Sequence, residues 1–201
     1  MQSARLFARW QARLAARTAV LRGAGKLCPT TQHAYRYMPH VSRLTAQLGS
    51  LLHAQRVASL GTIADDGGAL VSMVPYAIEP RLGCLVIHVS DLAAHTRNLQ
   101  VRPRASLLVM QPEAPGEPVH ALPRVTLEGT ARVLDPHSAD WQTSRTVYLQ
   151  RFPEAELMTQ LGDFKFVAVD IKGARQVAGF GLARSIDEEE VRLALTAQQP
   201  G

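Results

Sequence analysis

The stretch HVSDLAAHTRNL, residues 88–99, gathers the side chains whose types and spacing best suit the binding of an anion. It begins at the end of an apolar run that predicts a buried strand, and Ser90 and Asp91 are good caps for a following helix. The free N–H groups and positive dipole end of a helix start favour phosphate, and nearby imidazole and guanidinium groups add charge-assisted hydrogen bonds. The alternative is that His95 and Arg97 only form a solvated helix face. The candidate binding residues here are Ser90, His95, Arg97 and Asn98.

Familiar catalytic motifs are absent from the sequence. There is no Gly-rich phosphate loop with its lysine, no Gly-x-Ser-x-Gly elbow and no His-Glu-x-x-His zinc motif. The seven histidines include no pair at metal-ligand spacing beside a cysteine or a carboxylate. We therefore expect no metal site, and the sequence identifies no catalytic acid or base.

Charge and composition exclude several classes of protein. The first 37 residues carry seven Lys or Arg and no acid, whereas residues 38–201 hold 15 bases against 17 acids. A groove that tracks nucleic-acid phosphates is therefore not expected in the globular part. No apolar run approaches the roughly 18–20 residues that a membrane span needs. Two cysteines fit a reducing compartment, so we expect a cytoplasmic protein that acts on a small molecule, without nucleic-acid or membrane partners.

The N-terminal segment differs from the rest of the chain. Its arginines recur every four residues from Arg5 to Arg17, a spacing that predicts a cationic amphipathic helix. Three interpretations stay open: an organelle transit peptide, a membrane-surface helix, or a disordered extension upstream of a true start at Met38. The sequence thus divides into a basic extension at 1–37, a folded domain at 38–186 and an acidic tail at 187–201.

Short strands and tight turns are expected to position the anion-binding stretch. Alternating apolar residues around an Asp-Gly-Gly turn predict a first hairpin, in which Pro75 indicates an edge or an irregular stretch. Gly129 indicates a kink or bulge in a later strand. Few helices and closely spaced turns favour a small antiparallel barrel over a βαβ sheet. Strands are expected at 56–64, 69–78, 84–89, 104–110 and 124–134, a last hairpin at 164–171 with 174–177, and helices at 42–55 and 138–152 as well as after Ser90.

Seven blocks in a fixed order carry a family resemblance. The chain resembles the FMN-binding split barrels of the pyridoxamine 5′-phosphate oxidase family over residues 42–186, and it is most similar to the branch of haem-utilisation proteins and CREG-type barrels. The resemblance implies a mainly β (α+β) fold, an antiparallel split β-barrel with a few flanking helices. The blocks are RVASLGT (56–62), VSMVPYA (71–77), HVSDLAAHTRNL (88–99), PRASLLV (103–109), RVTLEGTARV (124–133), GDFKFVAVDI (162–171) and AGFGLARSI (178–186).

The resemblance also implies a site. In these barrels the strand that matches 71–77 runs along the isoalloxazine ring, and its backbone from Val74 to Tyr76 hydrogen-bonds the flavin edge. Ser72 falls where the family places a polar side chain near the phosphate or ribityl chain. Arg124 matches a flavin-contacting position on the second subunit, so the resemblance implies a homodimer with FMN between the protomers. The implied cofactor-binding residues are Ser72, Val74, Tyr76, Ser90, His95, Arg97, Asn98 and Arg124.

Departures from the family pattern bear on the reaction. Pyridoxamine phosphate oxidases carry Arg at Ser72 and Lys at Ala77, and their C-terminal Arg-Leu-His block has no counterpart here, so vitamin B6 oxidation is not expected. The haem-utilisation branch uses a C-terminal haem-ligating histidine, whereas this chain has none after His137. We expect an FMN-dependent oxidoreductase, with Tyr76 and His88 as candidates by proximity alone. The alternatives are a haem-binding or haem-utilisation protein and a non-catalytic CREG-like barrel, and F420 is an alternative cofactor.

Overall fold

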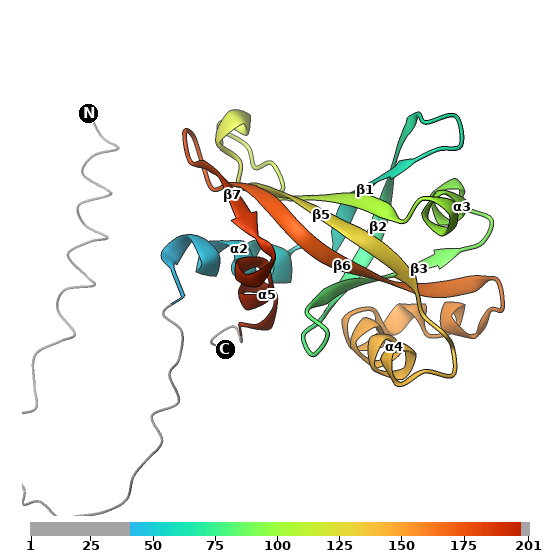
Figure 1. Cartoon of the computed structure of the whole chain (residues 1–201). Helices are drawn as coiled ribbons and strands as arrows, with labels where there is room; N and C mark the ends of the chain where they lie inside the picture. Colours follow the sequence, from blue (N-terminus) through green and yellow to red (C-terminus); the bar gives the residue numbers. More distant parts are fainter. Residues whose placement is uncertain (1–40, 198–201) are drawn as a thin grey trace, which may run out of the picture. The chain divides into compact units, whose positions relative to one another are not determined.

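Seven antiparallel strands form the sheet of this protein, and six of them close into a barrel (Figure 1). The strand order is β3-β2-β1-β4-β5-β6-β7, and the pairing of β3 with β6 closes the barrel, so that β7 is an additional strand beside β6. The structure is a computed structural model that describes residues 41–197, and the predictions for residues 1–37 lie outside this range. The strands are β1 Val57–Ile63, β2 Ala69–Glu79, β3 Cys84–Ser90, β4 Arg104–Met110, β5 Arg124–Val133, β6 Phe164–Val177 and β7 Ala183–Asp187.

Side chains that alternate between the two faces of the strands build the barrel core. Leu60 of β1 and Leu107 of β4 are fully buried, while Val57 and Met110 of the same strands are exposed on the outer face. This is the pattern of strands with one buried face, as the sequence predicts. The mainly β barrel with flanking helices is therefore confirmed.

The bulge predicted at Gly129 is confirmed. The pairing of β5 with β6 shifts between Glu128 and Gly129, because Lys172 of β6 has no partner residue on β5. A Cβ atom at Gly129 would lie 2.7 Å from the carbonyl oxygen of Asp170, closer than a side chain can approach. Only glycine therefore lets the two strands come together at this point.

Helices cover the barrel at several points. Ser42 and Ser138 cap α2 and α4 by accepting hydrogen bonds from the backbone N–H groups of Thr45 and Trp141, each at 3.1 Å, so both predicted helices are confirmed. None of the helices in residues 41–197 is long and apolar enough to cross a membrane. The helices of this range are α2 Arg43–Ala54, α3 Ala94–Val101, α4 Ala139–Arg151 and α5 Glu188–Thr196, with single 3₁₀ turns at η2 Val119–Ala121, η3 Pro153–Ala155 and η4 Met158–Gln160.

The structure of the C-terminal part corrects one prediction and adds a helix. Residues 164–177 form the single strand β6 rather than a hairpin, because the extra residue Lys172 is taken up as a bulge and β7 is the hairpin partner. The acidic tail is a helix, α5, in which Asp187 is the N-cap and accepts a hydrogen bond from the backbone N–H of Glu190 at 2.9 Å. Val191 and Leu195 of α5 are buried in the barrel core, so apolar burial fixes the helix while Glu188 and Glu189 face solvent.

Candidate functional site

Ser72 and His95 meet at the rim of the barrel. Ser72 lies on β2 on the same side as the buried Val74, and α3, which carries His95, packs against β1 and β2. The Ser72 hydroxyl oxygen lies 3.0 Å from His95 Nδ1. Partial burial lowers the pKa of His95 below its ordinary value, so the imidazole is neutral at pH 7. Its Nε2 has no hydrogen-bond partner in residues 41–197.

A compact turn fixes α3 in this position. The backbone oxygen of Ser90 accepts hydrogen bonds from Ala93 N at 3.1 Å and from the Thr96 hydroxyl at 2.6 Å. Asp91 ties the turn to β6, because its N–H donates to the Asp163 carbonyl at 2.7 Å and its carboxylate pairs with Lys165 at 2.8 Å. His95 is therefore held by both the preceding strand and the neighbouring one.

The start of α3 differs from the prediction. Ser90 and Asp91 are not its caps, because the helix begins at Ala94 and its N-cap, Ala93, has no side chain that can accept a hydrogen bond. The Ser90 hydroxyl instead accepts a hydrogen bond from Leu92 N at 3.2 Å within the turn. No side chain therefore satisfies the first-turn N–H groups of α3.

The predicted phosphate-binding residues do not converge. Arg97 is exposed and donates a hydrogen bond to the Leu92 carbonyl at 2.9 Å, back along its own chain. Asn98 is buried and donates to the Thr62 hydroxyl at 3.0 Å, which anchors α3 to β1. Of the residues predicted on this stretch, the structure brings only His95 together with Ser72.

The backbone N–H of Tyr76, predicted to hydrogen-bond the edge of a flavin, is already bonded within the chain. Its N–H donates to the Arg56 carbonyl at 3.1 Å, and its side chain lies in the core with the hydroxyl bonded to the Leu52 carbonyl at 2.7 Å. Val74 is also buried. The pairing of β2 with β3 begins only at Tyr76, so residues 69–75 are paired with β1 alone, in agreement with the edge that Pro75 indicates.

Arg124 lies away from the Ser72–His95 pair. It opens β5, pairs with Met110 of β4 and donates a hydrogen bond to the Leu122 carbonyl at 3.0 Å. Strands β1 and β4 separate it from β2 in the sheet. The structure does not bring Arg124 next to the Ser72–His95 pair of its own chain, and its predicted role from a second subunit stays a prediction.

His88 is not part of this site. It faces outward from β3 into the apolar layer beneath α4, where its ring stacks on Phe164 with the centroids 5.0 Å apart and contacts Phe166 at 4.5 Å. Burial lowers its pKa to about 4, so it is a neutral packing residue at pH 7. Its proximity to the anion-binding stretch in sequence is misleading, because alternate residues of a strand face opposite sides.

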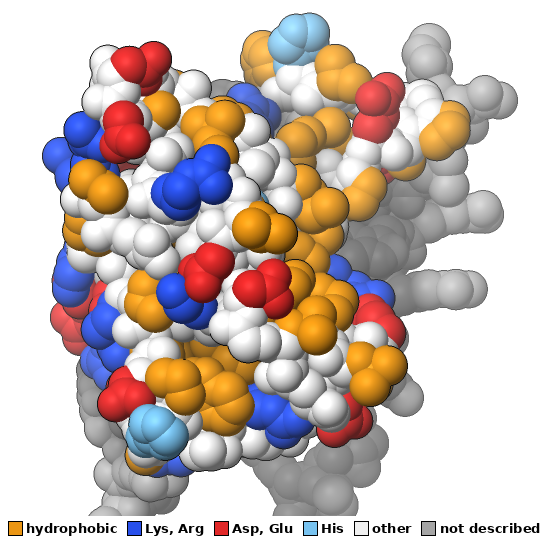
Figure 2. All heavy atoms as spheres, turned by 90° about the vertical axis from the view of Figure 1, so that its right-hand side faces the viewer, with side chains coloured by type: hydrophobic (Ala, Val, Ile, Leu, Met, Phe, Trp, Pro, Cys, Tyr) orange, Lys and Arg blue, Asp and Glu red, His pale blue; other side chains and the backbone are white. Residues whose placement is uncertain are grey.

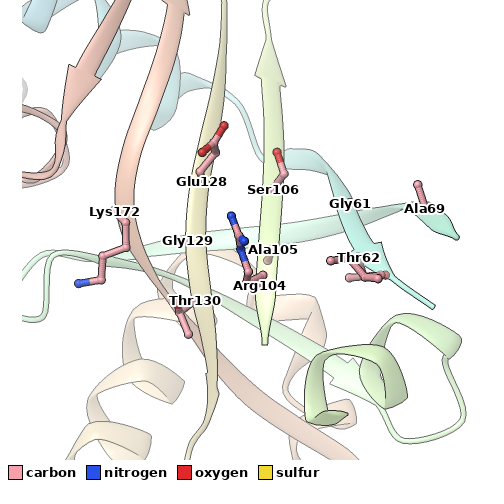
Figure 3. Close-up of a pocket in the computed structure, with 11 residues that line it drawn as sticks. Gly61, Thr62, Ala69, Arg104, Ala105, Ser106, Glu128, Gly129, Thr130 and Lys172 are labelled. Atoms are coloured by element: carbon pink, nitrogen blue, oxygen red, sulfur yellow. The ribbon is translucent and has the colours of Figure 1, made fainter. Parts of the chain in front are cut away.

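A hollow on the outer face of the sheet was not predicted from the sequence. It encloses about 610 Å³ over β1, β4, β5 and the β6 bulge (Figure 3). The charged residues that line it are Arg104, Glu128 and Lys172. Gly61 and Gly129 also line it and have no side chain that would fill it. The feature of the sequence that could have indicated this hollow is the presence of one glycine in β1 and one in β5, where a side chain would otherwise fill it.

The surface seen from the α3 end of the molecule carries charges of both signs. Basic and acidic side chains alternate there, and apolar patches lie between them (Figure 2).

Comparisons with known proteins agree on a family. The pyridoxamine 5′-phosphate oxidase family profile matches residues 44–178. The chain is 25% identical over 150 residues to heme oxygenase HutZ of Vibrio cholerae, covering 74% of this chain and 84% of HutZ. It is 32% identical over 139 residues to the chloroplastic non-canonical heme oxygenase HOZ of Arabidopsis thaliana, covering 68% of this chain and 41% of HOZ.

A solved structure extends the likeness to the fold. A heme binding protein from Mycobacterium smegmatis superposes on this chain with a TM-score of 0.67 at 28% identity. The alignment covers 74% of this chain and 59% of that one. The chain thus spans less than half of HOZ and about three fifths of the mycobacterial protein, and most of HutZ.

Proposed function

Because the chain belongs to the pyridoxamine 5′-phosphate oxidase family, we propose that it is a haem-binding split barrel with His95 as the ligand to the haem iron. Support comes from two relatives named heme oxygenases and one named heme binding protein. The observation that carries the proposal is the 3.0 Å contact between the Ser72 hydroxyl and His95 Nδ1.

The state of His95 fits an iron ligand. Ligation needs a neutral imidazole with one nitrogen unprotonated, and partial burial keeps the pKa of His95 below its ordinary value. When Nδ1 carries the proton and donates it to Ser72, the lone pair lies on Nε2. A hydrogen bond to the second ring nitrogen is the usual way in which proteins fix the tautomer of a metal-binding histidine.

The other histidines of residues 41–197 fit this role less well. His53 lies in the last turn of α2 with its Nε2 buried, and His88 is 7% exposed within the aromatic layer under α4. His120, in the 3₁₀ turn η2, and His137, in the turn before α4, are exposed and lie outside the strands. His95 alone in this range combines a fixed Nδ1 with a position at the rim of the barrel.

The chain's own residues would bind and orient the ligand. A bound haem supplies an iron centre that can be reduced and oxidised. Ser72 holds the His95 ring, and Asn98 fixes α3 to β1 through its bond to Thr62. We extend the proposal to haem degradation, the activity for which HutZ and HOZ are named, and to the homodimer that the resemblance implies.

Titration of the full chain with haem tests the proposal. We expect a shifted Soret band in the wild type and its loss in His95→Ala, because the ligand to iron is removed. His137→Ala serves as the matched control, since it removes an exposed histidine from a surface loop and should leave the spectrum unchanged. An unaltered Soret band and affinity in His95→Ala would show that the iron ligand lies elsewhere.

FMN remains a second candidate on one observation, the start of α3 without a side-chain cap. Such a helix end favours an anion, and the phosphate of FMN would place one there. Quenching of flavin fluorescence on addition of the full chain tests this candidate in parallel. A chain that binds neither haem nor FMN would favour the non-catalytic barrel.

A further inference from the structure

A cavity of about 350 Å³, the α2–α4 cavity, lies between the last turns of α2 and α4, at the far end of β2 from Ser72. The two helix ends supply its polar side chains, and the end of β2 with the turn after it supplies apolar ones. Its volume is at the lower end of the range found for small-molecule sites, so the cavity suits a small ligand. The residues that line it include Ala77, Pro80, Val147, His53, Gln150 and Arg151.

Arg151 brings a positive charge to this cavity without an acid to balance it. Its Nη2 donates hydrogen bonds to the His53 carbonyl at 2.9 Å and to the Gln55 carbonyl, and its Cζ lies 5.6 Å from the centre of the Tyr76 ring. No ion pair within residues 41–197 includes Arg151. A half-buried guanidinium that is held only by carbonyl oxygens and an aromatic ring leaves its charge for an anion to neutralise.

The charges around the cavity do not cancel that of Arg151. Glu154, in the turn that follows α4, pairs with Arg56 at 2.9 Å. Arg81, in the turn after β2, is exposed and takes part in no ion pair within the described part of the chain. In addition, Arg151 Nε and His53 Nε2 are buried without a hydrogen-bond partner there. Because buried polar atoms are nearly always hydrogen-bonded, these side chains have a bonding capacity that their own chain does not use.

We propose that the α2–α4 cavity binds a small aliphatic carboxylate, with its charged group on Arg151 and its alkyl chain on the apolar wall. A guanidinium matches a carboxylate in both shape and charge. Nη2 of Arg151 is bonded to α2, which leaves Nη1 to donate to the anion. Pro80 and Val147 give a short alkyl chain a surface away from water. The cavity shares no residue with the Ser72–His95 site, so this binding is independent of the proposed haem ligation.

Calorimetric titration of the full chain with acetate, butyrate and hexanoate tests the class of ligand. We expect saturable binding that tightens with chain length, by about fourfold for each methylene that is buried. Hexan-1-ol has a similar alkyl chain without the charge, and it should bind at least about tenfold more weakly than hexanoate because it cannot pair with the guanidinium. The proposal is overturned if hexanoate shows no saturable binding, or if hexan-1-ol binds as tightly as hexanoate.

Gln150→Glu tests the place of the ligand and keeps Arg151, whose hydrogen bonds to α2 support the fold. The added carboxylate repels the anion and competes for Arg151, so hexanoate binding should weaken about tenfold. Gln142→Glu makes the same exchange at an exposed position about two turns earlier on α4, outside the cavity, and should leave the affinity unchanged. Equal affinities in the two variants would place the ligand elsewhere and overturn the assignment.

His95→Ala separates this site from the proposed haem site. It should bind hexanoate as tightly as the wild type does, because neither His95 nor Ser72 lines the cavity. A weakened affinity in His95→Ala together with an unchanged one in Gln150→Glu would assign the carboxylate to the Ser72–His95 site and overturn the proposal. A wild type that binds no haem would refute the proposed function, whereas the titration with hexanoate would still decide this one.

Discussion

Ser72 and His95 show how one hydrogen bond can decide what a side chain does. An exposed histidine titrates near neutral pH and rotates freely, whereas His95 is half-buried and has its Nδ1 3.0 Å from a hydroxyl on a rigid strand. These two constraints fix both the charge and the direction of the remaining nitrogen. At the scale of residues, the site is therefore a pair rather than the phosphate-binding group that the sequence predicts.

The first prediction at this scale concerns Ser72. Ser72→Ala removes the partner of His95 Nδ1 without changing the ligand itself, and loss of such a supporting hydrogen bond weakens metal binding by about 10-fold or more. Haem titration of the full chain measures the change, and Ser72→Thr, which keeps the hydroxyl, should recover most of the affinity. Ser185→Ala on the exposed β7 is the control. Equal affinities in Ser72→Ala and wild type would remove Ser72 from the site.

The second prediction concerns His88 and pH. Its folded-state pKa of about 4 lies below the ordinary 6.5, so the unfolded chain binds the proton more readily and stability falls as the pH drops below 6.5. The expected loss between pH 7 and pH 5 is about 2 kcal/mol from this residue. Urea unfolding at both pH values measures it, and His88→Phe should lose less stability over the same interval. An identical loss in the variant would assign the pH dependence to other groups, such as His53.

At the scale of elements, the C-terminal helix is joined to the barrel by a polar cluster as well as by its apolar face. Glu190 of α5 accepts two hydrogen bonds from Arg184 of β7, at 2.9 and 2.7 Å, and a third from the Thr45 hydroxyl of α2. The hydrogen bonds from Arg184 lower the pKa of Glu190 below its ordinary value. One carboxylate thus joins β7 and α5, which are consecutive in sequence, to the distant helix α2.

Glu190→Gln tests this cluster. Removing the charge should lower the free energy of unfolding by about 1–3 kcal/mol, because hydrogen bonds to charged groups are the stronger ones. Since the folded pKa is depressed, the contribution is present above the ordinary carboxyl pKa and is lost as the pH falls through the folded value. Urea unfolding at pH 7 measures the difference against Glu189→Gln, an exposed acid of the same turn. Equal stability of the two variants would contradict a role for the cluster.

The elements also show what the sequence can predict. Strands such as β4 follow from local alternation, and the cap of α2 follows from one serine. β6 is misread because Lys172-Gly173 has the local composition of a turn, although it is a bulge whose partner strand lies far away in sequence. The helix α5 was not predicted, because its acids dominate the local composition. Only tertiary contacts decide both cases. They also give the two histidines different surroundings, since His95 lies beside the Ser72 hydroxyl and His88 lies among aromatic rings.

At the scale of the whole molecule, the two ends of the barrel differ in chemistry. One end carries α3 with the Ser72–His95 pair, and the other carries Arg124 and the β6–β7 hairpin with the exposed Phe180. In the homodimer that the resemblance implies, Arg124 would reach the site of the partner, and haem binding would then depend on protein concentration.

Barrel closure has a consequence for how the chain reaches this state during synthesis. β3 pairs with β6, and the helix α3, the strands β4 and β5 and the helix α4 all lie between them in sequence. Until β6 leaves the ribosome, β3 presents an unpaired, strongly apolar edge of the kind that joins chains into aggregates. Such distant pairings also form slowly, because a long loop must close before any contact is gained. The nascent chain is therefore most vulnerable over the interval between the emergence of β3 and that of β6, when a chaperone would have the most to protect.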